Sequence, residues 1–401
     1  MITTVEARDA ILATMPTFET ESISVRASVG RTLHQSVVAE RNQPPFDRVM
    51  MDGIAISFDD LTSGTRSFPI QATQAAGDGP LELEKSNCVE IMTGASLPKG
   101  ADCIVPVEHI SVDDNVAEIE VDYQATQRQF IHPRGSDHAE GTELLAPGKC
   151  ISPMDIAIIN SCGLTNVDCG KSPTIAVIST GNELVPAGEP IEAHQIRMSN
   201  GPAVISLLEQ HGYADCKHDH LVDEPEILKD RIGEHLNKSS VLLLSGGVSM
   251  GKADYIPQVL EDLGVKVVFH RISQRPGKPM WFGMGPENQA VFALPGNPVS
   301  TLVCCRHYVV PALNAASGMR EKQPEFAALT QDVTFEPKLS CFLPVRLLSN
   351  TGGQALAMPV HTNTSGDFAA LSNTDGYIEL ELEKSHFAAG TAAKLHRWNA
   401  R

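Results

Sequence analysis

The chain has 401 residues, with 31 Lys and Arg against 49 Asp and Glu, so its formal net charge is −18 at pH 7. Hydrophobic residues make up 42% and charged residues 20% of the chain, as in an ordinary globular protein of about two or three domains. These values exclude a wholly disordered chain, a fibrous repeat and a small disulfide-stabilised protein. The acidic balance makes nucleic acid and anionic membrane surfaces poor partners, although a single basic loop could still bind a small anion.

The first 18 residues mix acidic and basic side chains and have no continuous apolar segment, so they do not resemble a signal peptide. No stretch approaches the roughly 18 consecutive apolar residues of a membrane span. Nine cysteines occur without a Cys-x-x-Cys pair, which favours reduced, mostly buried thiols over zinc ligands. We therefore expect a cytoplasmic protein without a membrane span.

The predicted elements change character along the chain. Residues 3–15 and 152–162 have helical patterns, and between them residues 47–130 carry short β-rich runs with many turns, which predict a β lobe. From 172 to 318, strands are predicted over 174–179, 241–244, 265–272 and 290–294, and helices over 200–211, 255–263 and 299–313. This alternation predicts a parallel sheet covered by helices on both faces. From about residue 320 onward short strands predominate, as in a small β barrel or sandwich.

Five predicted strands end in loops rich in glycine or acidic residues. These loops are Ser179-Thr180-Gly181-Asn182-Glu183, Asp223 after His220-Leu221-Val222, Ser245-Gly246-Gly247-Val248-Ser249, Arg275-Pro276-Gly277-Lys278-Pro279 and Pro295-Gly296-Asn297-Pro298. Ligands of α/β sheets bind outside the carboxyl ends of the strands. The sequence therefore predicts a ligand site at this edge.

Two of the loops suit an oxyanion. Glycines at 246 and 247 would let backbone N–H groups approach a phosphate, with Ser249 beside them, although a tight turn with a serine cap explains them equally well. In Arg275 to Pro279 two prolines stiffen the chain around Gly277. The cations of Arg275 and Lys278 would therefore have defined positions, which suits an oxyanion; the alternative is a surface turn with solvated charges.

Three carboxylates, those of Glu183, Asp223 and Asp254, fall at or just after strand ends. Taken singly, each is explained by a helix cap or a solvated surface position. Taken together beside a phosphate loop, they favour Mg²⁺ between the carboxylates and the phosphate. Asp52-Gly53 and Thr93-Gly94 are explained by turns alone, and His218-Asp219-His220 by solvated histidines on one face of a strand rather than a metal chelate.

The ordered motifs resemble the molybdopterin molybdenumtransferase (MoeA) family, which is related to the gephyrin E domain, over nearly the whole chain. The matching segments are Val29-Gly30-Arg31-Thr32-Leu33, Pro44-Pro45-Phe46-Asp47, Met51-Asp52-Gly53, Ile91-Met92-Thr93-Gly94-Ala95, Gly100-Ala101-Asp102, Arg134-Gly135-Ser136-Asp137, Ser179-Thr180-Gly181-Asn182-Glu183-Leu184, Ser199-Asn200-Gly201, Gly246-Gly247-Val248-Ser249, Ala253-Asp254-Tyr255, Pro276-Gly277-Lys278-Pro279 and Leu294-Pro295-Gly296-Asn297-Pro298-Val299-Ser300.

The resemblance implies a fold and an activity. The family inserts molybdate into adenylylated molybdopterin and, with Mg²⁺, releases AMP and molybdenum cofactor. The implied fold is a homodimer with a discontinuous helical dimerisation domain (1–45 and 131–171), an inserted β lobe (46–130), a doubly wound α/β molybdopterin-binding domain (172–318) and a C-terminal β barrel (319–401). The implied site lies between the α/β domain of one subunit and the β lobe of the other. Candidate partners are a molybdopterin adenylyltransferase and molybdoenzyme-maturation proteins.

The resemblance also implies roles for individual residues. Asp52, Thr93, Glu183, Asp223, Asp254 and Lys278 match catalytic positions, with Glu183, Asp223 and Asp254 near Mg²⁺ and Lys278 near molybdate or the developing phosphate charge. The implied substrate-binding residues are Asp137, Thr180, Gly181, Gly246, Gly247, Ser249, Arg275, Pro276, Gly277, Pro295, Asn297, Pro298 and Ser300. Arg346 and Ser365, in the divergent C-terminal part, are the candidates for molybdate contacts.

The sequence departs from the family pattern at several positions. Arg48-Val49-Met50 replaces the frequent Asn-Ser-Ala, Ile54 replaces an aromatic residue, Asn182 replaces an aspartate, and Arg275 stands where lysine is frequent. Two alternatives to the insertase therefore stay open: a non-catalytic molybdopterin-binding scaffold and a paralogue specific for tungstate.

Overall fold

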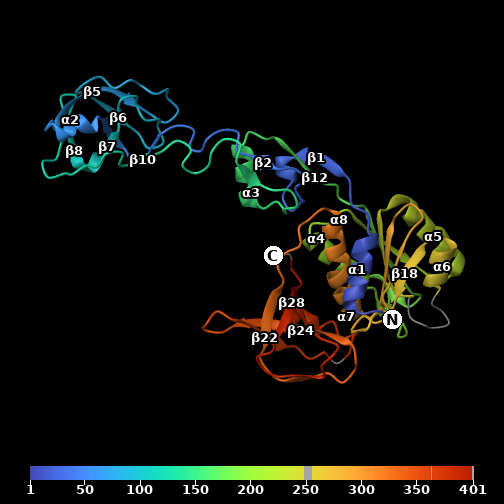
Figure 1. Cartoon of the computed structure of the whole chain (residues 1–401). Coiled ribbons are helices and arrows are strands. Elements are labelled where there is room, and N and C mark those ends of the chain that lie inside the picture. Colours follow the sequence, from blue (N-terminus) through green and yellow to red (C-terminus); the bar gives the residue numbers. More distant parts are fainter. Residues whose placement is uncertain (248–254, 363, 400–401) are drawn as a thin grey trace. The chain divides into compact units, whose positions relative to one another are not determined.

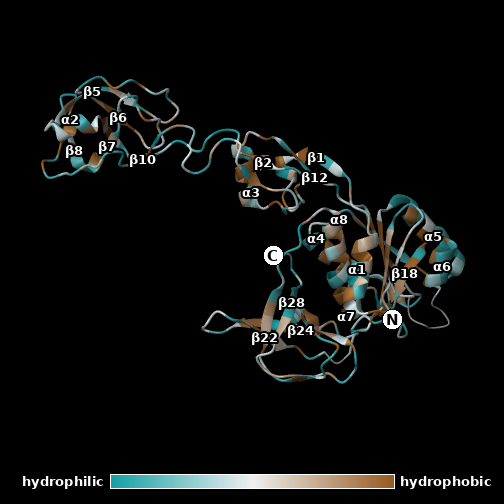
Figure 2. Ribbon diagram, in the orientation of Figure 1, coloured by the Kyte–Doolittle hydropathy of each residue, from teal (hydrophilic) through white to brown (hydrophobic). Residues whose placement is uncertain are grey.

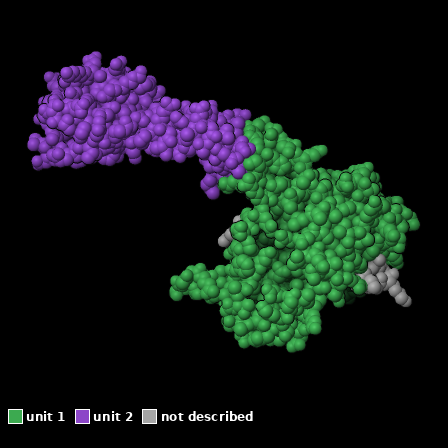
Figure 3. Space-filling model, viewed as in Figure 1, with its two compact units in different colours: residues 1–35, 147–152, 166–401 green, residues 36–146, 153–165 purple. Residues whose placement is uncertain are grey.

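The computed structural model describes residues 1–247, 255–362 and 364–399 (Figure 1). The chain forms two compact units, one of residues 1–35, 147–152 and 166–401 and the other of residues 36–146 and 153–165 (Figure 3). All nine cysteines are free. Among the described helices, none combines the length and the apolar character that a membrane crossing needs.

The smaller unit contains the predicted β lobe, a six-stranded sheet in the order β7-β4-β6-β5-β9-β8. Its strands are β4 (Gly53–Ile56), β5 (Ser67–Gln74), β6 (Cys88–Ile91), β7 (Cys103–Pro106), β8 (Ile110–Asp113) and β9 (Val116–Ile119). Side chains alternate across a strand, so Ile54 and Ile56 enter one buried cluster, with Leu61 of helix α2 (Phe58–Thr62), while Ala55 enters another. Both faces of β4 are therefore buried.

The rest of this unit consists of short pairings and one helix. Strand β2 (Val37–Val38) pairs with β11 (Glu143–Leu145), and β3 (Arg48–Val49) pairs with β10 (Ile131–His132), both antiparallel. Helix α3 (Pro153–Ser161) lies within the predicted range 152–162.

The larger unit is built on a second six-stranded sheet, in the order β16-β13-β17-β21-β20-β18. Its strands are β13 (Ile175–Thr180), β16 (Cys216–Leu221), β17 (Val241–Ser245), β18 (Lys266–His270), β20 (Trp281–Met284) and β21 (Ala290–Leu294). The first four strands of this order are parallel, as predicted, but β20 runs antiparallel to both β18 and β21. The chain reverses directly between β18 and β20 through residues 271–280, and a direct reversal without a crossover helix gives an antiparallel pair.

Helices cover both faces of this sheet, so the predicted doubly wound α/β arrangement is confirmed (Figure 1). Along β13, Ile175 and Val177 enter the buried cluster beneath helices α1, α4, α7 and α8, while Ala176 and Ile178 enter the cluster beneath α5 and α6. These helices are α1 (Thr4–Thr14), α4 (Asn200–Gln210), α5 (Pro225–Lys238), α6 (Ile256–Asp262), α7 (Pro298–Cys304) and α8 (Val310–Ala316). Figure 2 shows the strands of this sheet coloured mostly as hydrophobic, whereas the covering helices carry both hydrophobic and hydrophilic segments.

The helix predicted over 299–313 is interrupted. Helix α7 passes into a π-helical turn, η3 (Cys305–Val309), and then into α8. Pro311 explains the interruption, because a proline ring inside a regular α-helix clashes with the carbonyl of the residue four positions earlier. The wider π-helical turn before Pro311 avoids this clash, and apolar side chains of α7, η3 and α8 stay buried in the same core cluster.

The C-terminal part forms the predicted barrel. Strands β24, β25, β22, β28 and β26 pair in that order, and β24 also pairs with β26, which closes the ring. The strands are β22 (Glu325–Leu329), β24 (Ser340–Ser349), β25 (Ala355–Pro359), β26 (Gly376–Leu380) and β28 (Ala392–Arg397). The short strand β19 (Gln274–Arg275), from the α/β domain, adds to β24 in parallel.

Helix α1 packs on the α/β domain, against residues that follow it by more than 150 positions in the sequence. Thr3 and Glu6 form a capping box at its start, which satisfies two of the free N–H groups there. Ala7, Ile11 and Met15 are buried in the same cluster as Val310 of α8. The predicted helix over residues 3–15 is thus confirmed, and its apolar stripe completes the α/β core.

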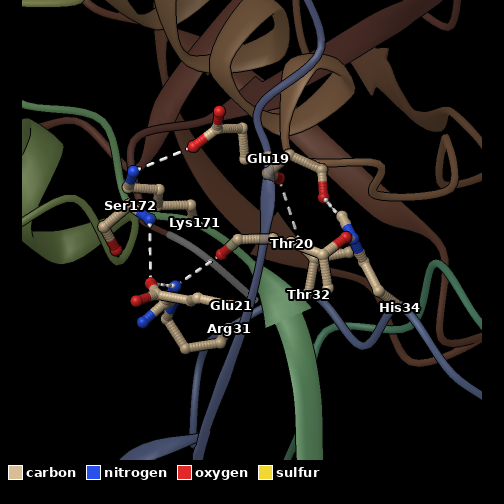
Figure 4. A network of polar contacts seen from close by, with 10 residues as sticks. Glu19, Thr20, Glu21, Arg31, Thr32, His34, Lys171 and Ser172 are labelled. Carbon is tan, nitrogen blue, oxygen red and sulfur yellow. Dashed lines mark hydrogen bonds and ion pairs between the residues drawn. The ribbon is translucent and has the colours of Figure 1, made fainter.

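A polar network joins the β1–β12 ribbon to the end of α8 (Figure 4). Strands β1 (Thr20–Ser24) and β12 (Asn166–Gly170) are antiparallel. Arg31 contacts the Glu21 carboxylate and the Gly170 carbonyl, both at 2.5 Å. His34 Nε2 donates to the Ser317 carbonyl at 2.8 Å, so its Nδ1 accepts from the Thr20 hydroxyl, also at 2.8 Å.

Replacing Arg31 with methionine is expected to lower the free energy of unfolding by about 1–3 kcal/mol, because it removes the charged donor of the Gly170 carbonyl and of the half-buried Glu21 carboxylate, which retains the Ser172 N–H at 3.3 Å. Urea unfolding followed by circular dichroism measures this change. The matched control is Lys171→Met, which breaks the exposed Lys171–Glu19 pair and should cost no more than about 1 kcal/mol. Equal losses in the two variants would contradict a structural role for Arg31.

Candidate functional site

The carboxyl ends of four parallel strands meet at one edge of the α/β sheet. In the observed register Thr180 lies opposite Leu221, and Ser245 lies between Ser179 and Leu294. The strands therefore end level with one another. The loops that follow them are the glycine-rich and acidic loops singled out in the sequence, as the sequence predicted.

Glycine is required at this edge because the loops approach one another closely. At Gly246, where φ is 109°, a Cβ atom would lie 2.7 Å from the Thr180 carbonyl oxygen and 2.8 Å from Thr180 Oγ1. At Gly247, where φ is 64°, it would lie 2.6 Å from a side-chain carbon of Ile256. The buried Thr180 hydroxyl has no hydrogen-bond partner among the described residues. At this edge the backbone is too tightly packed for side chains at Gly246 and Gly247, and the Thr180 hydroxyl is left without a partner in the described ranges.

Asn200, at the start of α4, connects two of the loops. Its Nδ2 donates to Ser245 Oγ at 2.9 Å and to the Gly296 carbonyl at 2.7 Å. Its buried Oδ1 has no partner within the described part of the chain. Asn200 was not among the predicted site residues, although it stands in the Ser199-Asn200-Gly201 segment, and that match was the available signal.

Two of the three predicted metal-binding carboxylates come from neighbouring loops. The Asp223 N–H donates to Asn182 Oδ1 at 3.0 Å, which holds the loop after β16 against the loop that carries Glu183. Glu183 is exposed, and its carboxylate packs against Gly181, where a Cβ would lie 2.6 Å from Oε2. Asp254, like Ser249, lies outside the described residues.

Glu183 and Asp223 are the described members of the predicted Mg²⁺ set. Mg²⁺ is usually bound by one or two carboxylates together with substrate phosphates and water. Within the described ranges no group of three or more His, Cys, Asp or Glu residues is placed to hold a metal ion.

The histidines of β16 lie within hydrogen-bond distance of β13 and its loop. His220 Nε2 donates to the Gly181 carbonyl at 2.9 Å, and His218 Nε2 lies 3.0 Å from Ser179 Oγ. Asp219, which points to the other face, pairs with Arg231 and His235. His218 is exposed, but the predicted solvated pair is in fact hydrogen-bonded to β13 and its loop.

The loop from Arg275 to Pro279 belongs both to the α/β sheet and to the barrel. Arg275 lies opposite Cys341 in the β19–β24 pair. At Gly277, where φ is 97°, a Cβ would lie 2.4 Å from Cys304 Sγ and 2.6 Å from Gln274 Nε2. Arg275 and Lys278 are exposed, and among the described residues neither side chain has a hydrogen bond or ion pair. The loop therefore presents two uncompensated cations on a tightly packed backbone.

The loop after β21 also reaches the C-terminal part. Asn297 Nδ2 donates to Ser365 Oγ at 2.8 Å, and the Val299 N–H donates to the Ser365 carbonyl at 3.1 Å. Ser300 is buried in the first turn of α7. Arg346 lies on β24 opposite Met358, exposed, and in the described structure no hydrogen bond joins it to these loops. The structure thus brings Ser365 to the loop edge but shows no such contact for Arg346.

In the smaller unit, Asp52 and Thr93 form a pair that local turn preferences did not predict. Both the N–H and the hydroxyl of Thr93 donate to Asp52 Oδ1 at 2.6 Å. The hydroxyl bond and then the backbone bond lower the pKa of the Asp52 carboxyl, because both favour its charged form. The carboxylate is exposed and keeps Oδ2 free of any hydrogen bond within the described part of the unit.

Asp137 lies in a separate group of the same unit. His132 Nδ1 lies 3.1 Å from Arg48 Nη2, and its Nε2 lies 2.9 Å from Asp137 Oδ1. Because a guanidinium only donates, Nδ1 accepts and Nε2 donates to the carboxylate. Arg48, one of the departures from the family pattern, therefore orients His132 toward Asp137.

Comparison with known proteins assigns the class. Residues 2–163 match the MoeA N-terminal region (domain I and II), residues 176–315 the "Probable molybdopterin binding domain", and residues 327–398 the MoeA C-terminal region (domain IV). The fold matches the crystal structure of a molybdopterin biosynthesis MoeA protein from Pyrococcus horikoshii with a TM-score of 0.82, at 27% identity over 100% of both chains. The fold is therefore that of a MoeA protein of molybdenum cofactor biosynthesis.

The curated relatives define the family. A molybdopterin molybdenumtransferase from Synechocystis is 36% identical over 99% of this chain and 100% of its own length. Another, from Haemophilus influenzae, is 30% identical over 100% of this chain and 99% of its own. The chain belongs to the molybdopterin molybdenumtransferase (MoeA) family and is a transferase. The domain boundaries given above stay predictions.

Thr93→Val is expected to raise the pKa of Asp52 toward its ordinary value, because it removes one of the two bonds that favour the carboxylate, while the backbone bond keeps a residual lowering. NMR titration of the Asp52 carboxyl carbon measures the shift. Thr93→Ser, which retains the hydroxyl, is the control and should titrate as the parent chain does. An unchanged pKa in Thr93→Val would show that the hydroxyl does not bond to Asp52 in solution.

Proposed function

We propose that this transferase inserts molybdate into adenylylated molybdopterin and releases AMP and molybdenum cofactor in a Mg²⁺-dependent reaction. The observation that carries the proposal is the convergence, at one edge of the α/β sheet, of close-packed glycine loops, the exposed Glu183 and half-buried Asp223 carboxylates, and two cations without an ion pair among the described residues. A phosphate-bearing substrate with a second oxyanion needs these features together. The family and the names of the relatives support the substrate class.

The loops of β13, β17 and β21 would bind the phosphate and pterin portion. Gly246 and Gly247 have no side chains to block a ligand. The Gly246 N–H already donates to the Leu294 carbonyl at 3.3 Å, whereas the Gly247 N–H and the Thr180 hydroxyl have no partner among the described residues and are available to phosphate oxygens. Gly181 and the loop of Pro295 would complete the surface. Ser249 remains a candidate by sequence alone.

Glu183 and Asp223, with Asp254, would hold Mg²⁺ against the pyrophosphate. When bound there, the ion neutralises the charge that develops on the phosphate as the phosphoanhydride is cleaved. The Asn182 bridge keeps the two loops at a constant separation, so Glu183 and Asp223 need little rearrangement.

Molybdate would bind on the barrel side of the same edge. Lys278 and Arg275 carry the charge that attracts it, with Pro276 and Gly277 setting their positions. Hydrogen bonds could come from Asn297 and Ser300 after β21 and from Ser365 of the C-terminal part, which is bonded to Asn297. Pro298 has no N–H and could only shape the surface. Arg346 is retained as a candidate on sequence grounds only.

The catalytic site would be completed by Asp52 and Thr93 of the β lobe and by Asp137, which follows the lobe in sequence. The exposed, charged Asp52 carboxylate is suited to accept a proton or orient a water. We further propose a cytoplasmic homodimer that receives its substrate from an adenylyltransferase. Sedimentation equilibrium of the purified chain tests the dimer directly.

Lys278→Met is expected to lower molybdate-dependent AMP release by about 10²–10³-fold, the usual loss when one charged donor is removed from a developing oxyanion. The assay mixes purified protein with adenylylated molybdopterin, Mg²⁺ and molybdate, and follows AMP and cofactor together. Lys238→Met is the control, because Lys238 is exposed at the end of α5, just before the opposite end of β17.

Two outcomes would contradict the insertase. Tight binding of adenylylated molybdopterin by the parent chain without turnover would indicate a scaffold. Turnover with tungstate but not with molybdate would indicate the tungstate paralogue.

Glu183→Gln and Asp223→Asn are each expected to raise the Mg²⁺ concentration that gives half-maximal AMP release by about 10- to 100-fold, because a neutral amide is a weaker ligand for a hard cation. Titration of Mg²⁺ in the same assay gives this value. Glu189→Gln, at an exposed position beyond the loop, should leave it unchanged. A lower maximal rate with no change in the Mg²⁺ dependence would remove these carboxylates from the metal site.

A further inference from the structure

A cavity of about 360 Å³ lies between the α/β domain and the barrel, separate from the loop edge. Its walls come from α1, α8, the segment 319–325, and strands β26 and β28. No residue that we place in the transferase site is among its described lining residues. Its volume falls within the range of small-molecule sites, yet the proposed reaction makes no use of it.

The cavity is basic within an acidic chain. Six Arg and Lys residues and three Glu residues line it, a difference of +3, against −18 for the whole chain. Two of the glutamates are already paired, Glu321 with Arg8 at 3.0 Å and Glu325 with Arg397 at 2.8 Å. Arg320 and Lys394 have no ion-pair partner among the described residues. Their charge is therefore available to a ligand.

The deep part of the cavity contains polar groups that are incompletely satisfied. Glu379 accepts a hydrogen bond from the Thr4 hydroxyl at 3.2 Å, and its other oxygen lies 3.5 Å from His396 Nε2. That nitrogen is buried and has no hydrogen-bond partner among the described residues. A buried polar atom without a hydrogen bond costs free energy, but the Glu379 carboxylate beside it would repel an anion, so the anionic group of a ligand belongs at the cations instead.

The remaining wall is apolar. It is lined by Val5 and Leu12 of α1, Pro311 and Ala315 of α8, and Met319. An inorganic anion would leave this surface in contact with water, whereas a molecule with an apolar body would cover it. The two kinds of surface, basic and apolar, therefore select a ligand that has both.

We propose that this cavity binds a small amphiphilic organic anion, in which one anionic group contacts Arg320 and Lys394 and an aromatic or aliphatic body packs against Leu12 and Met319. Such a ligand contacts α1 and α8 of the α/β domain and β28 of the barrel together. The inference is independent of the proposed reaction, because it uses no residue of the loop edge.

The test uses 8-anilinonaphthalene-1-sulfonate, an anionic aromatic fluorophore, titrated into the full chain. We expect a saturable fluorescence increase that the double variant Arg320→Glu/Lys394→Glu weakens about tenfold or more, equivalent to about 1.4 kcal/mol. The matched control is Lys85→Glu/Lys99→Glu, the same charge change at exposed positions of the other unit. N-phenyl-1-naphthylamine, which has the same ring system without the sulfonate, should bind more weakly by a similar factor.

A second variant tests the cavity without changing its charge. Ala315→Trp, from the exposed side of α8, should fill the space and prevent binding, while circular dichroism confirms that the variant folds. Unchanged dye binding in both the double variant and Ala315→Trp would overturn the proposal. Loss of binding in Lys278→Glu instead would place the dye at the loop edge and would equally overturn it.

Discussion

The parallel pairing of β13 with β16 and β17, and of β17 with β21, is the constraint on which the rest of the larger unit depends. Every residue of β13, β17 and β21 is buried, so a slip of one residue would transfer each side chain to the opposite face. The register is therefore tightly specified by the two cores. Because the register is fixed, the four strands end together and their loops come within hydrogen-bonding distance.

The sequence predicted the parts of this arrangement that follow from local pattern. Buried strands are short apolar runs, and the loops after them were recognisable because glycine and acidic residues recur at each end. Strand β20 was not predicted. It is short, and its antiparallel direction follows from the chain reversal at residues 271–280, which hydrophobic periodicity does not reveal. Pro311 could have indicated the interruption of the last helix, but its consequence depends on how the π-helical turn accommodates the ring.

The site was predicted less completely than the fold, for a physical reason. Residues on loops of one sheet edge can be grouped by topology, and Thr180, Glu183 and Asp223 were found in this way. Asn200 acts through two hydrogen bonds to segments 45 and 96 residues away, which sequence spacing does not reveal. Asp52 and Thr93 were explained locally by turns, and only the resemblance to a family connected them before the structure showed their bond.

The packing of α1 has a consequence for how the chain is made. Its apolar stripe packs against elements that end near residue 316, so the first helix leaves the ribosome long before its partners exist. The smaller unit lies between them in sequence and can complete its own core first, since domains generally fold as units during synthesis. During that interval α1 must remain exposed or be shielded by a chaperone. Folding of the α/β domain is thus completed late, when α1 packs against elements that are synthesised after the smaller unit.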